Sequence, residues 1–86
     1  MDFTGKRAIV TGGANGIGKE VVHGIVEGGG SVIIADINEV AARATIAEFG
    51  PAVDFVHMDL GDHQAIETAM QSILSRPERV DILVNC

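Results

Sequence analysis

The chain has 86 residues, a formal net charge of −6 and only six lysine and arginine residues. This length allows one domain at most, so residues 1–86 are expected to form a single unit. The basic residues are scattered, which argues against a nucleic-acid partner, because neutralising phosphates requires clustered Lys and Arg. Hydrophobic residues make up 47% of the chain but aromatic residues only 3%, so the core is expected to be aliphatic.

Other compositional features exclude further classes of protein. The single cysteine, Cys86, is the last residue, so no internal disulfide can form. The first residues contain no signal-peptide apolar segment, and no apolar run approaches the length of a membrane span. His23, His57 and His63 have no metal-ligand spacing, so no metal site is expected. We therefore expect a soluble, cytoplasmic protein with no membrane partner.

Strand-like and helix-like segments alternate along the chain. Four short segments are mostly β-branched or aliphatic and are bounded by Gly, Pro or Asp, which is typical of strands. They span residues 7–11, 31–36, 53–58 and 80–85. Three segments with helical periodicity lie between them. The resulting β-α-β-α-β-α-β order predicts an α/β fold with a parallel sheet and crossover helices.

Each expected helix has a candidate apolar face. Asn38 is the predicted N-cap of the second helix, glycines 28–30 are expected to end the first, and Pro77 follows the third. The predicted faces are Ile17, Val21, Gly24, Ile25 and Gly28 on the first helix, Val40, Ala41, Ala44 and Ala47 on the second, and Ile66, Ala69, Met70, Ile73 and Leu74 on the third.

Handedness rules constrain the order of the strands in the sheet. Right-handed crossovers favour a doubly wound sheet in the order 3-2-1-4, with the third helix on the opposite face from the first two. In such a sheet, ligands bind at the carboxyl ends of the strands. Gly12, Asp36, Asp59 and Asn85 all fall at these ends. Their convergence is the main internal support for a binding site.

Residues 11–18, Thr-Gly-Gly-Ala-Asn-Gly-Ile-Gly, follow the first expected strand and precede the first expected helix. A glycine loop in this position is typical of a dinucleotide pyrophosphate site: one glycine makes the tight turn, one lets the backbone approach phosphate, and one allows close helix packing. Free N–H groups and the helix dipole favour the anion. The alternative is that these glycines only make a tight turn. The residues assigned to the loop site are Gly12, Asn15, Gly16, Ile17 and Gly18.

A different class of nucleotide site is compatible with part of the same loop. Residues 13–19 fit G-x-x-x-x-G-K, which begins the loop of nucleotide triphosphatases. Glu20 stands where that motif needs a magnesium-binding Ser or Thr hydroxyl. A carboxylate there would face the triphosphate, so the dinucleotide interpretation is favoured.

Asp36 ends the second expected strand, in the region where an acid receives the adenosine ribose. Its carboxylate can accept hydrogen bonds from both ribose hydroxyls and would repel a 2′-phosphate. Ile37 supplies no positive charge to offset that repulsion, so NAD is the predicted cofactor. The alternative is that Asp36 only begins the turn into the next helix or helps Asn38 to cap it.

Two further strand ends complete the candidate site. Asp59 can accept a hydrogen bond from the adenine amino group while Leu60 packs nearby, although Asp59 can equally serve the turn that starts the third helix. Asn85 can hold the chain beside the cofactor, or be a simple strand-end asparagine.

Together these motifs closely resemble the short-chain dehydrogenase/reductase family over nearly all 86 residues. Residues 11–18 match the family's T-G-x-x-x-G-x-G, and Asp36 matches its NAD-selecting acid. Asp59 and Leu60 match its adenine-contacting pair, and Asn85 matches the first Asn of N-N-A-G. The resemblance implies a Rossmann-like doubly wound sheet and NAD(H)-dependent chemistry on alcohols or ketones.

The chain also departs from that family. Cys86 stands at the second Asn of N-N-A-G, the chain contains no tyrosine, and the family's later Ser and Tyr-x-x-x-Lys have no counterparts. We therefore expect residues 1–86 to be the N-terminal part of one NAD-binding domain, with the adenosine and pyrophosphate site but no catalytic residue and no turnover of its own. The competing hypothesis is a non-catalytic NAD-binding or interaction module. Complete relatives are usually homo-oligomers, and the fourth strand is expected to be an exposed edge through which this chain could self-associate.

Overall fold

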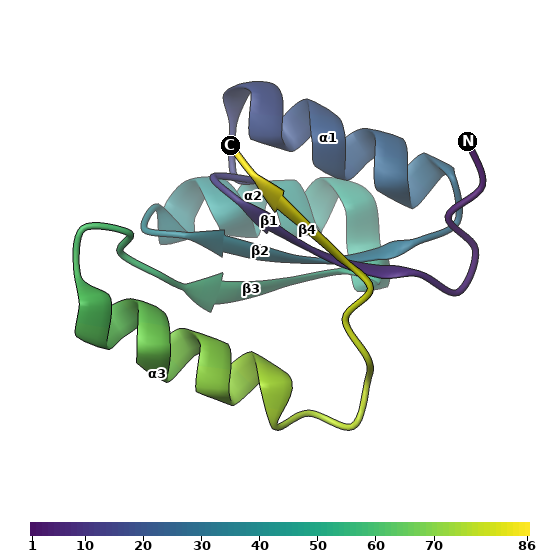
Figure 1. The fold of residues 1–86 in the computed structure, drawn as a ribbon. Helices are drawn as coiled ribbons and strands as arrows, with labels where there is room; N and C mark the ends of the chain where they lie inside the picture. Colours follow the sequence, from purple (N-terminus) through teal and green to yellow (C-terminus); the bar gives the residue numbers. More distant parts are fainter.

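A computed structural model describes residues 1–86 as a four-stranded parallel sheet with helices on both faces (Figure 1). The strand order is β3-β2-β1-β4 and every neighbouring pair is parallel. This confirms the predicted α/β fold and the predicted strand order. In chain order the elements are β1 (Arg7–Thr11), α1 (Gly16–Glu27), β2 (Ser31–Asp36), α2 (Glu39–Phe49), a 3-10 turn (Gly50–Ala52), β3 (Val53–His57), α3 (His63–Leu74) and β4 (Ile82–Asn85).

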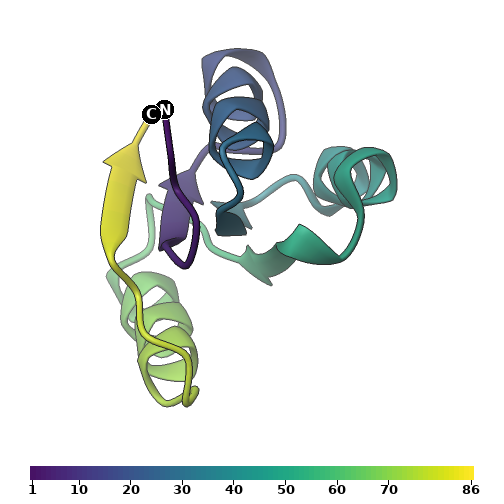
Figure 2. The same ribbon diagram turned by 90° about the vertical axis from the view of Figure 1, so that its right-hand side faces the viewer.

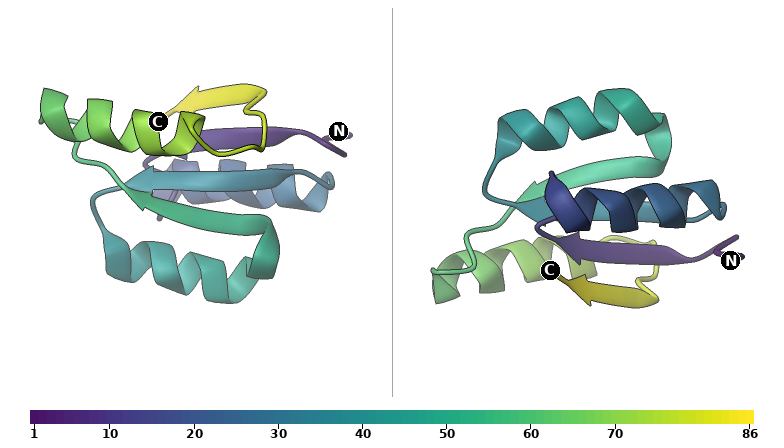
Figure 3. Two further views of the ribbon diagram at one scale, coloured as in Figure 1. Left: turned by 90° about the horizontal axis from the view of Figure 1, so that it is seen from below. Right: turned by 90° about the horizontal axis from the view of Figure 1, so that it is seen from above.

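The helices divide between the two faces as the handedness rules predict. Figures 2 and 3 show α1 and α2 on one face of the sheet and α3 on the other. Alternate residues of β2 supply two separate cores: Ile34 packs in the core under α1 and α2, whereas Ile33 packs with Ile73 of α3. Ile33 and Ile34 are both fully buried, which explains why this strand is apolar without alternation. None of the helices combines the length and apolar character that a membrane span needs.

The predicted apolar faces of α1 and α2 are partly wrong. Ile17 is 79% exposed and Val40 is 83% exposed, whereas Val22, Ala42 and Thr45 are buried. Apolar spacing gives the period of a helix, but in alanine-rich α2 it leaves the direction of the buried face poorly defined. Thr45 was outside the predicted face because it is polar, yet it is fully buried.

The third helix and the helix starts agree better with the sequence patterns. Ala69 and Ile73 are buried on α3 as predicted, although Leu74 is 65% exposed. Asn38 caps α2 as expected, because its side chain accepts a hydrogen bond from the Ala41 N–H at 3.0 Å. Asp62 does the same for α3.

The fourth strand starts at Ile82, later than expected, and Asp81 anchors the segment just before it to β1. The Arg7 N–H donates to Asp81 Oδ2 at 3.0 Å, and the Asp81 N–H donates to the Arg7 carbonyl oxygen at 2.8 Å. Arg79 Nε lies 2.9 Å from Asp81 Oδ1. These contacts fix the register of β4 against β1 before the regular ladder begins at Ile82.

We predict that this anchor makes the stability of the fold sensitive to acid. The hydrogen bond from the Arg7 N–H, aided by the charges of Arg79 and Lys6, holds the pKa of Asp81 below its ordinary value of 3.8. A carboxyl group with a lowered pKa stabilises the fold above its unfolded pKa, and the stabilisation is lost as the pH falls through the folded pKa. Asp81→Asn should therefore lower the melting temperature at neutral pH, and the difference from the wild type should shrink below pH 3.8. A difference in melting temperature that does not change with pH would contradict this role.

Candidate functional site

The loop between β1 and α1 has a backbone that requires glycine. Gly12 and Gly16 have φ angles of +69° and +61°, a region that residues with a side chain rarely adopt. The Gly12 N–H donates to the Ala35 carbonyl oxygen of β2 at 2.9 Å, which ties the loop to the neighbouring strand. A Cβ at Gly16 would meet nothing within 4 Å, so the backbone there faces open space.

Gly18 allows α1 to pack directly on this loop. A Cβ at Gly18 would overlap the Gly12 carbonyl oxygen and would lie 3.0 Å from Gly13 Cα. No side chain fits between the first turn of α1 and the loop. This contact brings the amino end of α1 to the carboxyl end of β1.

The amino end of α1 is free to bind an anion. Asn15 is the N-cap residue, but its side chain makes no capping hydrogen bond, whereas the caps of α2 and α3 both do. No backbone acceptor is found for the N–H groups of Gly16, Ile17 and Gly18. Such N–H groups and the positive end of the helix dipole favour a negatively charged ligand.

Asp36 lies at the end of β2 and contacts the backbone with both carboxylate oxygens. Oδ2 accepts a hydrogen bond from the Ala14 N–H at 3.1 Å, and Oδ1 accepts one from the Asn38 N–H at 3.0 Å. The turn into α2 that the sequence left as an alternative is therefore present. Each oxygen keeps a further lone pair for a ligand, because a carboxylate can accept about four hydrogen bonds.

A groove of about 240 Å³ lies at this edge of the sheet. It contains four residues predicted for the site, one from the loop after β1, one from the end of β2 and two from the segment after β3. These four are Gly12, Asp36, Asp59 and Leu60, and the remaining lining residues are Ala35, Ile37, Met58 and Gly61. Asp59 Oδ1 also accepts a hydrogen bond from the Gly61 N–H at 2.9 Å, so the predicted turn role of Asp59 is present too.

Asn85 lies beside the glycine loop but not in the lining of the groove. The Thr11 hydroxyl donates to Asn85 Oδ1 at 2.7 Å and accepts a hydrogen bond from the Cys86 N–H at 3.2 Å. Thr11 is 6% exposed, so its side chain joins the ends of β1 and β4 in a shielded position. Asn15, Gly16 and Ile17 are exposed at the start of α1, outside the groove lining.

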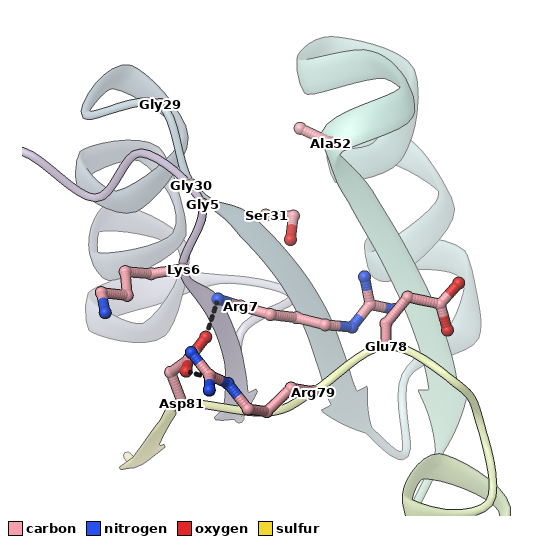
Figure 4. Close-up of a pocket in the computed structure, with 10 residues that line it drawn as sticks. All are labelled: Gly5, Lys6, Arg7, Gly29, Gly30, Ser31, Ala52, Glu78, Arg79 and Asp81. Carbon is pink, nitrogen blue, oxygen red and sulfur yellow. Dashed lines mark hydrogen bonds and ion pairs between the residues drawn. The ribbon is translucent and has the colours of Figure 1, made fainter.

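The opposite edge of the sheet has a second cavity of about 410 Å³ (Figure 4). Of its five charged residues, Arg79 and Asp81 form an ion pair, and Asp81 also accepts a hydrogen bond from the Arg7 main-chain N–H. Arg7 Nε is buried without a hydrogen-bond partner. No group of three or more His, Cys, Asp or Glu residues is arranged to hold a metal ion.

A contact between Ala14 of the glycine loop and Thr45 of α2, two residues that were not assigned to the site, holds the loop. Ala14 is 2% exposed, and its carbonyl oxygen lies 3.1 Å from the hydroxyl of Thr45 on α2. The contact joins residues 31 positions apart, so no local pattern could have indicated it. The only available signal was a threonine in an otherwise apolar helical row.

Comparison with known proteins identifies the family. Residues 6–86 match the family model described as short chain dehydrogenase. The chain belongs to the short-chain dehydrogenase family. Sorbitol dehydrogenase from Cereibacter sphaeroides is 45% identical over 85 residues, which cover 99% of this chain and 33% of that protein.

Solved protein structures share the fold. The structure of gox2181 has a TM-score of 0.91 and 38% identity, over 99% of this chain and 34% of that one. The 3-ketoacyl-(acyl-carrier-protein) reductase from Brucella melitensis, complexed with NADH, has a TM-score of 0.87 and 30% identity, over 95% of this chain and 34% of that one. The chain thus spans about a third of the length of the relatives it matches, and its sheet is Rossmann-like.

Two glycines of α1 provide a matched test of the packing at this site. Gly18→Ala should destabilise the fold by about 1–3 kcal/mol, because the added methyl group overlaps the loop backbone. Gly24→Ala, in the same helix, places a methyl group in open space and should stabilise the fold by about 0.5–1 kcal/mol. Chemical denaturation measures both effects. Equal effects of the two substitutions would show that the contact between Gly18 and the Gly12 carbonyl group does not hold α1 in place.

Proposed function

We propose that residues 1–86 form the adenosine- and pyrophosphate-binding part of an NAD(H)-dependent alcohol or ketone oxidoreductase of the short-chain dehydrogenase family. The observation that carries this proposal is the uncapped amino end of α1, packed beside a groove that contains Asp36. The reductase from Brucella melitensis, solved with NADH, lends support from a similar structure. When bound, the nicotinamide of such a cofactor accepts or donates a hydride.

The glycine loop fits the pyrophosphate. The N–H groups of Gly16, Ile17 and Gly18 have no backbone acceptor, and no acidic side chain lies in the first turn of α1 to repel an anion. The open space beside Gly16 leaves room for phosphate oxygens to approach the backbone. We assign the pyrophosphate to this end of the helix.

The groove fits the adenosine. Asp36 would accept hydrogen bonds from the ribose hydroxyls, and Asp59 would accept one from the adenine amino group. Leu60 and Ile37, which are 52% and 58% exposed, offer apolar contacts on the same groove. Asn85 would act less directly, by holding β4 beside the loop through Thr11.

The relatives are named for different substrates, a sugar alcohol in one and a carrier-bound ketoacyl group in another. These names describe proteins about three times as long as this chain. What residues 1–86 supply is the positioning of the adenosine end of the cofactor.

Cofactor preference gives the most direct test of the proposed site. The carboxylate of Asp36 beside a 2′-phosphate should cost about 1–3 kcal/mol, so NAD⁺ should bind about 5- to 150-fold more tightly than NADP⁺. The double substitution Asp36→Ala with Ile37→Arg should reverse the sign of this preference. Isothermal titration of both cofactors measures the ratio of the two dissociation constants.

The ratio is the decisive quantity because Asp36 also holds the loop through the Ala14 N–H. Its removal should weaken the binding of both cofactors, whereas only the charge change should alter their ratio. Ile37→Arg alone is the matched control, since it adds the positive charge and keeps the carboxylate. Equal affinity of the unaltered chain for NAD⁺ and NADP⁺ would refute the assigned role of Asp36.

A further inference from the structure

The residue Ala14 in the glycine loop is held by side chains on both of its polar groups. Its N–H donates to Asp36 Oδ2 at 3.1 Å, and its carbonyl oxygen accepts from Thr45 Oγ1 at 3.1 Å. Ala14 is 2% exposed and Thr45 is fully buried. The contact with Thr45 is therefore shielded from water.

Thr45 is the one hydrogen-bond donor available to the Ala14 carbonyl group. No backbone N–H donates to this oxygen. The Thr45 hydroxyl has a single hydrogen and also lies 3.0 Å from the Ala41 carbonyl oxygen in its own helix, a contact that threonines in helices often make. That oxygen is one turn before Thr45 in α2, where the helical ladder already supplies an N–H donor. The loop carbonyl group has no such substitute.

The position of this carbonyl group fixes the direction of the next N–H group. The Ala14 carbonyl and the Asn15 N–H belong to one peptide unit, and in a planar trans peptide they point in opposite directions. With the carbonyl oxygen turned toward α2, the Asn15 N–H is turned away from α2. No backbone acceptor is found for the Asn15 N–H.

We propose that Thr45 is a positioning residue for the cofactor: its hydroxyl holds the Ala14–Asn15 peptide so that the Asn15 N–H joins the free N–H groups of α1 in binding the pyrophosphate. This inference rests on the proposed NAD(H) site and assigns a role in it to α2. Thr45 itself is fully buried and lies outside the groove lining. It acts through the orientation of one peptide group.

Thr45→Val tests the proposal, because it removes the hydroxyl and keeps the branched shape. The loss of one hydrogen bond that orients the loop should weaken the binding of NAD⁺ and of ADP about tenfold. Adenosine lacks the pyrophosphate, so its affinity should change by less than about twofold on the same scale. Thr45→Ser keeps the hydroxyl and should retain the affinity for NAD⁺. Thr68→Val, at an exposed position of α3, is the control for the substitution type.

Two outcomes of the binding experiment would overturn the proposal. If adenosine binding falls as much as ADP binding, Thr45 only supports the fold. If Thr45→Ser weakens NAD⁺ binding as much as Thr45→Val, the hydroxyl is not the group that matters.

Amide hydrogen exchange tests the loop contact without any ligand. In Thr45→Val, the exchange rate of the Ala14 amide should rise about tenfold relative to that of the buried Ile33 amide in β2. If the unaltered chain binds no NAD⁺ and exchange at Ala14 still responds to Thr45→Val, the proposed function fails while the loop contact stands. If exchange at Ala14 does not respond, or is unprotected in the unaltered chain, the positioning role of Thr45 is wrong.

Discussion

The close packing of α1 on the loop that precedes it is the constraint on which the rest of the site depends. Gly18 lies so near the Gly12 carbonyl group that no side chain fits between them. This contact fixes the amino end of α1 at the carboxyl end of β1, which is paired on both sides, with β2 and with β4. The free N–H groups of the helix are therefore held beside the ends of three strands, where loops from β1, β2 and β3 form one groove.

Polar groups are paired differently at the two ends of the strands, called here the amino edge and the carboxyl edge of the sheet. At the amino edge, two ion pairs, Arg79–Asp81 and Arg76–Asp54, join neighbouring segments of the chain. At the carboxyl edge, the start of α1 has neither a side-chain cap nor an acidic residue in its first turn. The free N–H groups at the start of α1 favour an anion, and ligands of open α/β sheets bind at the carboxyl ends of the strands, so binding is expected at the carboxyl edge.

The sequence predicted the fold well, and it placed four of the residues assigned to the site in one groove, because both results depend on local patterns. Short apolar strands between helical segments, together with handedness, gave the strand order, and strand ends gave Gly12, Asp36 and Asp59 as neighbours. The sequence could not predict which face of α2 is buried, because alanine provides little contrast between faces. It also could not predict the contact of Thr45 with the loop, because a hydrogen bond across 31 positions has no local signature.

Mapping the NAD⁺ site by two-dimensional ¹H–¹⁵N NMR tests the central claim most directly. Added NAD⁺ should shift the amide signals of residues 12–18, 36–37 and 59–61, which come from the loop and the groove. The amide signals of the amino edge, residues 5–7 and 78–81, should not shift. These residues lie at the amino ends of the strands, and the groove lies at the carboxyl ends. Shifts confined to the amino edge, or no shifts at the start of α1, would contradict the account.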